Sequence, residues 1–154
     1  MKVLTVLLIV TATAALSAVA RADQAHPPIE RLPALTLNGK PLPFSAGVRV
    51  GEVLYLSGQI GLGTDDKLPA AFQAQAKNTL DRIGVTLKSA GLSWEDVIRC
   101  TVFLSDMANW PTFNEIYATY VDPKHLPARS ALGTSGLALG ALVEVQCDAY
   151  DPPK

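Results

Sequence analysis

Two segments in the second half of the chain alternate between a mainly apolar and a mainly polar set of side chains. In the first segment, 97–104, the apolar set is Ile98, Cys100, Val102 and Leu104, and the other set is Arg99, Thr101 and Phe103. In the second, 142–150, the apolar set is Val143, Val145, Cys147 and Ala149, and the other set is Glu144, Gln146 and Asp148. Because successive side chains of a strand point to opposite faces, each segment predicts a strand with one face on the core. The other face is only half polar, so we expect a second subunit to cover it.

Shorter patterns predict the remaining elements. Apolar runs bounded by turn residues predict three more strands, at 46–50, 53–60 and 129–134. Apolar side chains recur at steps of three and four from Phe72 to Leu87, which predicts a helix that ends at Gly91. A second helix is expected to begin at Asn109, with Pro111 in its first turn. The order of these elements predicts an α+β fold, with two helices packed on one face of a mostly antiparallel sheet.

The N-terminal residues have the pattern of an export signal. Lys2 precedes an apolar run from Val3 to Leu16, and Ala20-Arg21-Ala22 forms a small-x-small cleavage site. The pattern predicts a signal peptide at 1–22, an extended proline-rich lead-in at 23–42 and one domain at 43–154. An uncleaved membrane anchor is the alternative, because the apolar run is nearly long enough to span a bilayer. Cleavage is favoured, so we expect a periplasmic or secreted protein without a membrane segment.

Charge and cysteine content narrow the function classes. Without residues 1–22 the chain has 11 basic and 14 acidic side chains, a net charge of −3, with no basic cluster. This balance argues against a nucleic-acid partner. Cys100 and Cys147 lie in apolar strand-like runs, and we favour two buried free thiols over a disulfide, which an oxidising compartment would allow. No zinc, phosphate-loop or dinucleotide motif is found, so the sequence predicts no metal and no cofactor.

One arginine and one carboxylate frame the stretch from Pro127 to Glu144. Arg129 and Glu144 have no charged side chain between Ala131 and Gly140. A guanidinium binds a carboxylate through two parallel hydrogen bonds, and a carboxylate on a neighbouring strand can orient a water. Together these groups suffice to hydrolyse an activated carbon–nitrogen double bond. The other interpretation is an ordinary ion pair between adjacent strands, and the spacing does not separate the two.

Two further patterns leave alternatives open. Gly58 follows Ser57 at a strand end, where it either lets a ligand or another backbone come close or forms a bulge that turns the chain. The second predicted helix carries an aromatic stripe of Trp110, Phe113, Tyr117 and Tyr120. Such a stripe is more typical of core packing than of a ligand site. Tyr117 and Asn114 stay candidates for the edge of a pocket.

Five sequence runs together resemble one known family. They are Val53–Ile60, Cys100–Met107, Phe113–Tyr117, Pro127–Ser130 and Val143–Val145. In this order they resemble the RidA/YjgF family of reactive intermediate deaminases, over roughly Pro43 to Tyr150. The resemblance implies a chorismate-mutase-like fold and a homotrimer with its sites in the clefts between subunits. It also implies hydrolysis of 2-imino or enamino acids to 2-keto acids and ammonia without a cofactor.

The resemblance also assigns roles to individual residues. Arg129 matches the arginine that binds the substrate carboxylate, and Glu144 matches the glutamate that positions the attacking water. The positions that match the family's substrate pocket are Phe44, Ser57, Gly58, Asn114 and Ala131. Two of them depart from the usual pattern, since Ala131 stands where deaminases often carry a cysteine and Phe44 where they often carry a tyrosine.

Two other functions stay open. The first is a non-catalytic trimer that binds small carboxylates in the same clefts, which the two departures and the export signal favour. The second is the endoribonuclease or translation-inhibitor activity also associated with the family. A net charge of −3 on an exported chain argues against the second function.

Overall fold

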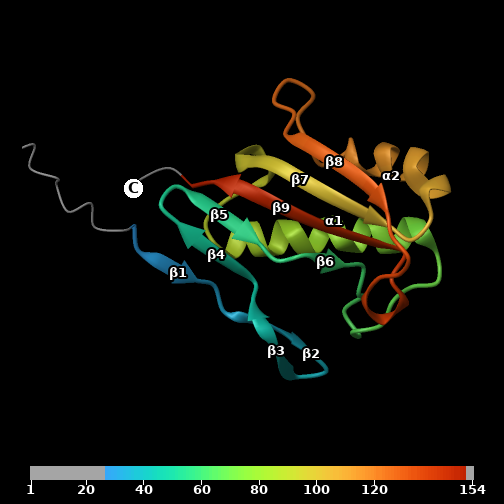
Figure 1. Ribbon diagram of the computed structural model, residues 1–154, viewed down its shortest axis with the longest axis horizontal. Helices are drawn as coiled ribbons and strands as arrows, with labels where there is room; N and C mark the ends of the chain where they lie inside the picture. Colours follow the sequence, from blue (N-terminus) through green and yellow to red (C-terminus); the bar gives the residue numbers. More distant parts are fainter. Residues whose placement is uncertain (1–26, 152–154) are drawn as a thin grey trace, which may run out of the picture.

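A single twisted sheet with helices on one face forms the body of the protein. The computed structural model describes residues 27–151, so the predicted signal peptide lies outside the described residues. The strands of the main sheet run in the order β1-β4-β5-β9-β7-β8, and β6 also pairs with β9. Among the strand pairs of residues 27–151, only β7–β8 is parallel. The predicted α+β class, with two helices on one face of a mostly antiparallel sheet, is confirmed (Figure 1).

The strands of the main sheet are β1 Ile29–Arg31, β4 Gly47–Val50, β5 Val53–Leu56, β6 Gln59–Ile60, β7 Val97–Leu104, β8 Ala128–Gly133 and β9 Val143–Tyr150. A separate hairpin consists of β2 Ala34–Leu37 and β3 Lys40–Ser45. The helices are α1 Phe72–Ser89 and α2 Trp110–Tyr117, and the short 3-10 turns are η1 Trp94–Asp96, η2 Met107–Asn109 and η3 Ala138–Gly140.

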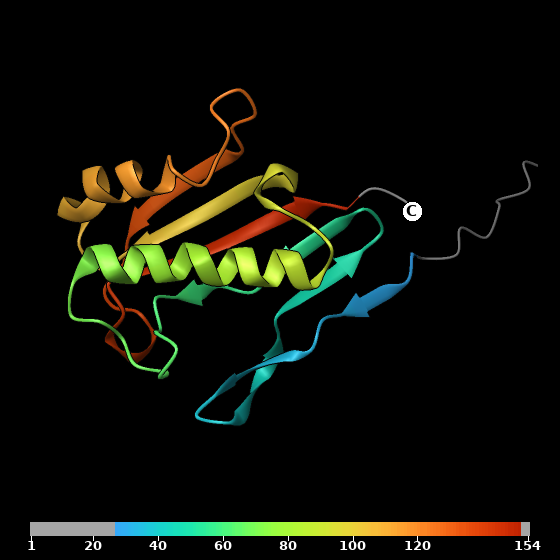
Figure 2. The same ribbon diagram turned by 180° about the vertical axis from the view of Figure 1, so that it is seen from behind.

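The core lies between α1 and the helix-facing side of the sheet, and Figure 2 shows α1 crossing that side. The apolar steps that predicted α1 all point inward, and its residues Ala76, Leu80, Ile83 and Leu87 are fully buried. They pack against the inward side chains of the central strands, among them Leu54, Val102, Val143 and Val145. Burial of this apolar surface is the main force that holds the helix on the sheet.

The N-terminal segment adds strands that the sequence pattern did not reveal. Within the expected lead-in at 23–42, β1 pairs with β4 at the edge of the main sheet. A turn at Asn38-Gly39 joins β2 to β3, and both turn residues have positive φ, 50° and 71°. This is the conformation that a two-residue hairpin turn requires. The β2–β3 hairpin extends away from the main sheet (Figures 1 and 2).

Strand β7 differs from its predicted alternation at one end. Its register with β9 shifts between Val97 and Arg99, so Ile98 is an extra residue in the ladder. A bulge of this kind lets two successive residues leave the regular alternation. Val97 is therefore buried, whereas Ile98 is 46% exposed. The prediction that Ile98 faces the core is wrong, and the other three residues of that apolar set are buried as predicted.

The preference for two free thiols is also wrong. Cys100 on β7 and Cys147 on β9 are directly opposite each other in the register and form a disulfide. Both cysteines are 1% exposed, so the bridge lies inside the core. Facing residues of adjacent antiparallel strands have close Cβ atoms, which is the geometry that a bridge needs. Each segment alone does not show this pairing, because the pairing depends on the register between two distant segments.

The face of the sheet opposite the helices is open. Tyr55 and Leu132 on this face are 47% and 43% exposed. Asp148 forms an ion pair with Arg99. The expectation that a second subunit covers this face stays a prediction. Within residues 27–151, neither helix has the length and apolar character needed to cross a membrane.

Candidate functional site

The two principal candidates, Arg129 and Glu144, lie on strands that are not neighbours. Strand β7 separates β8 from β9, with Arg129 opposite Cys100 and Glu144 opposite Phe103. Three residues along β7 and two strand spacings place their Cα atoms roughly 14 Å apart. Arg129 points to the helix-facing side, and Glu144 points to the open side because Val143 and Val145 are buried against the helices. The interpretation of an ion pair between adjacent strands is therefore wrong for the single chain.

Arg129 is held by three side chains of α2. Its guanidinium carbon lies 4.6 Å from the centre of the Trp110 ring and 4.5 Å from that of Tyr117. One of its terminal nitrogens donates a hydrogen bond of 2.7 Å to Asn114 Oδ1. Cation–π contacts with two rings hold the guanidinium, and the remaining N–H groups stay available to an anion.

Helix α2 therefore contributes side chains both to the hydrophobic core and to the candidate site. Phe113 is fully buried in the core, while Asn114, Tyr117 and Arg129 line a cavity of about 400 Å³, here called the Arg129 cavity. Burial raises the pKa of Tyr117, and the nearby charge of Arg129 opposes this shift. The Tyr117 hydroxyl is buried without a partner among the described residues. The aromatic stripe predicted as core packing thus also builds a wall of a cavity.

Glu144 lies at a second cavity, of about 350 Å³, that Arg82 of α1 also lines. This Glu144 cavity is lined by the polar or charged residues Gln59, Arg82 and Glu144. Gly58, Phe44 and seven further apolar residues complete the lining. A Cβ atom at Gly58 would collide with the Glu144 carboxylate, so a glycine is needed for the carboxylate to lie there. The group that comes close to Gly58 is a side chain, neither a ligand nor another backbone, and Gly58 also lies in the break between β5 and β6, so both interpretations of Gly58 stay open. Burial raises the pKa of Glu144 above that of an ordinary glutamate.

The remaining predicted residues lie beside the two cavities. The Ser57 hydroxyl donates to the Ser45 carbonyl at 2.7 Å, a contact that joins the end of β5 to the end of β3. Ser57 and Gly58 also interrupt the strand predicted at 53–60, which divides into β5 and β6. Ala131 lies two residues after Arg129 on the same face of β8 and packs partly against the core. The structure therefore brings the predicted residues together as two groups, not one.

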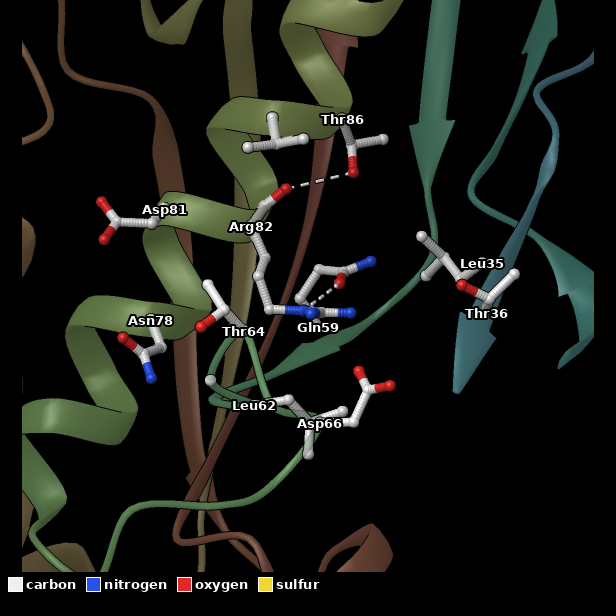
Figure 3. Close-up of a pocket in the computed structure, with 12 residues that line it drawn as sticks. Leu35, Thr36, Gln59, Leu62, Thr64, Asp66, Asn78, Asp81, Arg82 and Thr86 are labelled. Carbon is white, nitrogen blue, oxygen red and sulfur yellow. Dashed lines mark hydrogen bonds between the residues drawn. The ribbon is translucent and has the colours of Figure 1, made fainter. Parts of the chain in front are cut away.

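Sequence patterns alone did not identify Arg82. Its Nε donates a hydrogen bond of 3.1 Å to Oε1 of Gln59, a side chain that is only 2% exposed. Arg82 lines the Glu144 cavity and also a neighbouring cavity of about 530 Å³ between α1 and β2 (Figure 3). One signal was available, because Asn78, Arg82 and Thr86 recur at steps of four along one flank of α1. All three residues line the neighbouring cavity.

The described residues contain no group of three or more His, Cys, Asp or Glu side chains placed to hold a metal ion. The polar groups of the two cavities are a guanidinium, an amide and a phenol in one, and a carboxylate, an amide and a guanidinium in the other. Such groups can bind an anion and activate a water.

Comparisons with known proteins give the family. The Endoribonuclease L-PSP family model matches residues 39–151. The 2-iminobutanoate/2-iminopropanoate deaminase of Mus musculus is 38% identical over 113 residues, which are 72% of this chain and 83% of the mouse protein. The deaminase of the same name from Homo sapiens is 34% identical over 113 residues, 72% of this chain and 82% of the human protein.

Solved structures agree with this likeness. The structure of E. coli TdcF with bound serine matches with a TM-score of 0.69 and 30% identity, over 79% of this chain and 94% of TdcF. RidA from an Antarctic Psychrobacter species matches with a TM-score of 0.69 and 30% identity, over 78% of this chain and 94% of that one. This chain therefore belongs to the Endoribonuclease L-PSP family, also called the RidA/YjgF family.

Proposed function

We propose that this protein hydrolyses reactive 2-imino and enamino acids to 2-keto acids and ammonia, at sites between neighbouring subunits of a homotrimer. The observation that carries the proposal is the separation of the two chemical roles. Arg129 and Asn114 line one cavity, Glu144 and Gly58 line another, and the Arg129 and Glu144 side chains point to opposite faces of the same sheet. One chain cannot join these groups, whereas two copies can if the Arg129 group of one meets the Glu144 group of the next. The likeness to named deaminases supports the reaction class.

Arg129 would act as the carboxylate clamp. The Trp110 and Tyr117 rings and the Asn114 amide hold its guanidinium before a substrate arrives. A clamp that is already ordered loses little conformational entropy on binding, and two parallel hydrogen bonds fix the orientation of the substrate carboxylate. The imine carbon is then presented to the water at a defined angle.

Glu144 would act as the base that positions and activates water. The carboxylate accepts a proton from water as the water oxygen bonds to the imine carbon, and the nitrogen receives that proton. In the resulting carbinolamine the hydroxyl proton passes to the nitrogen, the C–N bond breaks as the C=O bond forms, and ammonia leaves. Burial raises the pKa of Glu144, which makes its carboxylate a stronger base than an exposed one.

The reaction is tested with 2-iminobutyrate and 2-iminopropionate generated in the assay. The protein is expected to accelerate their loss, and Arg129→Ala and Glu144→Gln are each expected to lower kcat/KM at least about a hundredfold. Arg31→Ala and Glu52→Gln remove the same groups from exposed positions outside both cavities, so they should leave the rate unchanged. Wild-type protein that does not accelerate loss of any imino acid in a broad panel would exclude the function.

A mixing experiment tests the shared site. The two inactive variants, Arg129→Ala and Glu144→Gln, are co-expressed so that they form mixed trimers. If each site takes its arginine from one subunit and its carboxylate from the next, random mixing restores about a quarter of the sites. If both residues act from one chain, no mixed trimer contains an intact site and activity stays absent.

A non-catalytic carboxylate-binding trimer is the second candidate. The observation in its favour is the apolar lining of the Glu144 cavity, where Phe44 provides no hydroxyl. Calorimetry would then show 2-keto acids binding to wild type but not to Arg129→Ala, while no imino acid is turned over.

A further inference from the structure

Arg82 lines the same cavity as Glu144, although Arg82 belongs to α1 and Glu144 belongs to β9. Glu144 reaches the cavity from the open face of the sheet, and Arg82 reaches it from α1 on the other face. Between them the lining is mostly apolar and includes Leu35, Leu62 and Phe44. The cavity therefore has a carboxylate, an amide and a guanidinium on an otherwise apolar wall, which is how small-molecule sites fix the orientation of a ligand.

The geometry leaves the Arg82 charge available. Arg82 and Glu144 form no ion pair, and Arg82 has no carboxylate within ion-pair distance among residues 27–151. Its hydrogen bond to Gln59 uses only Nε, and no described residue accepts a hydrogen bond from its two terminal NH₂ groups. These are the groups with which an arginine binds a carboxylate.

The two carboxylates that line the neighbouring cavity, Asp66 and Asp81, are already engaged. Asp66 accepts a hydrogen bond of 2.8 Å from the Asn38 backbone amide. Asp81 accepts from Lys77 at 2.6 Å and from the Tyr120 hydroxyl at 2.7 Å. In Figure 3 the Arg82 side chain extends from α1 toward Gln59, and Asp81 lies on another side of the helix.

Gln59 explains why the guanidinium is held in place. Its side chain is buried, its Oε1 accepts from Arg82, and its Nε2 donates to the Ser57 carbonyl at 3.5 Å. Arg82 is thereby connected to the same Ser57-Gly58 segment on which the Glu144 carboxylate lies. A charged side chain that is anchored at Nε and open at its two NH₂ groups is suited to bind an anion, not to support the fold alone.

We propose that Arg82 is a second anion-binding residue of the site, and that it gives a preference for 2-imino acids with a second carboxylate on the side chain. This inference rests on the proposed function. Arg129 of one subunit would bind the carboxylate next to the imine carbon, and Arg82 beside Glu144 would bind the side-chain carboxylate. Selectivity follows because a monocarboxylic substrate leaves the Arg82 guanidinium without a partner in the closed site.

The first test compares kcat/KM for 2-iminoglutarate and 2-iminobutyrate. Wild type is expected to prefer the dicarboxylic substrate by about tenfold, the effect of one hydrogen-bonded charge contact at a half-buried group. Arg82→Met keeps an unbranched apolar side chain and removes the charge, so it should abolish the preference for the dicarboxylic substrate. Lys88→Met removes a charge from an exposed position of α1 and should keep the preference.

The ratio of two substrates does not depend on how much protein is folded, so a partly unfolded variant still gives an answer. Equal losses with both substrates in Arg82→Met, or a wild type without the dicarboxylic preference, would overturn the proposal and leave the deaminase function standing. If wild type hydrolyses no imino acid, the deaminase function itself fails. Calorimetry then decides on Arg82, since 2-ketoglutarate should bind about tenfold more tightly than 2-ketobutyrate to wild type and not to Arg82→Met.

Discussion

Glu144 has its position because Gly58 has no side chain. The carboxylate lies where a Cβ atom at residue 58 would be, and burial raises its pKa. Arg129 depends on its neighbours in a different way, through the two rings that contact its guanidinium. At the scale of single residues, both candidate groups are thus arranged before any substrate binds. Variants that displace these two groups without unfolding the chain should change kcat while leaving the free energy of unfolding nearly unchanged.

Gly58→Ala is expected to displace the Glu144 carboxylate and to lower kcat about tenfold or more, because a water misplaced by about 1 Å reacts poorly. The Glu144 side chain is flexible, so the free energy of unfolding should change by less than about 1 kcal/mol. Gly136→Ala is the matched control, since a Cβ atom there meets nothing within 4 Å. Full activity of Gly58→Ala would show that this carboxylate position is unimportant.

The pH dependence of kcat/KM should report on Glu144. Only the ionised carboxylate can accept a proton from water, so activity falls when Glu144 becomes protonated on the acid side. Burial raises the pKa of Glu144, so the fall should be centred at a higher pH than for an ordinary glutamate. A profile measured with 2-iminobutyrate checks this, and an acid limb at or below the ordinary glutamate value would contradict it.

At the scale of elements, local patterns predicted most strands and both helices, and they failed where two elements interact. The alternation in β7 and β9 identified their core faces correctly apart from Ile98, which the bulge moves outward. The disulfide between Cys100 and Cys147 was not predicted, because it also depends on how β7 and β9 pair. Register between segments that are 47 residues apart is decided by pairing, not by either segment alone.

The disulfide is expected to contribute strongly to stability. It closes a loop between residues 47 positions apart, and the chain-entropy model gives about 4 kcal/mol for a loop of this length. Reductant, or the double variant Cys100→Ala/Cys147→Ala, should therefore lower the urea midpoint of unfolding. The double variant itself should not respond to reductant. A wild-type midpoint that is the same with and without reductant would rule out a stabilising bridge.

At the scale of the whole molecule, two features have no explanation within one chain. The open face of the sheet exposes Tyr55 and Leu132, and the Arg129 and Glu144 side chains point to opposite faces of the sheet. A homotrimer in which each sheet meets its neighbours would account for both features. The signal-peptide hypothesis also belongs to this scale, because it concerns where the assembled protein works.

Leu132→Lys places a charge on the open face, where burial against a second subunit would be costly. The variant is expected to shift the protein from trimer to monomer in light scattering coupled to size-exclusion chromatography, and to lose activity together with assembly. Val85→Lys is the control, since Val85 is 70% exposed on α1, on the side of the sheet away from the open face. A monomeric wild type, or a monomeric variant that stays fully active, would contradict the intersubunit site.

The sequence by itself determined both helices, the strands around 46–56, 97–104, 128–133 and 143–150, and the core face of β9, and it named Arg129 and Glu144 as candidates. These properties depend on neighbours within a few positions, which a chain encodes locally. Only the tertiary structure decided that β7 separates Arg129 from Glu144, that the cysteines are bridged and that Arg82 lies beside Glu144. Strand order, register and the approach of α1 to β6 arise from contacts between distant segments, and no local pattern specifies them.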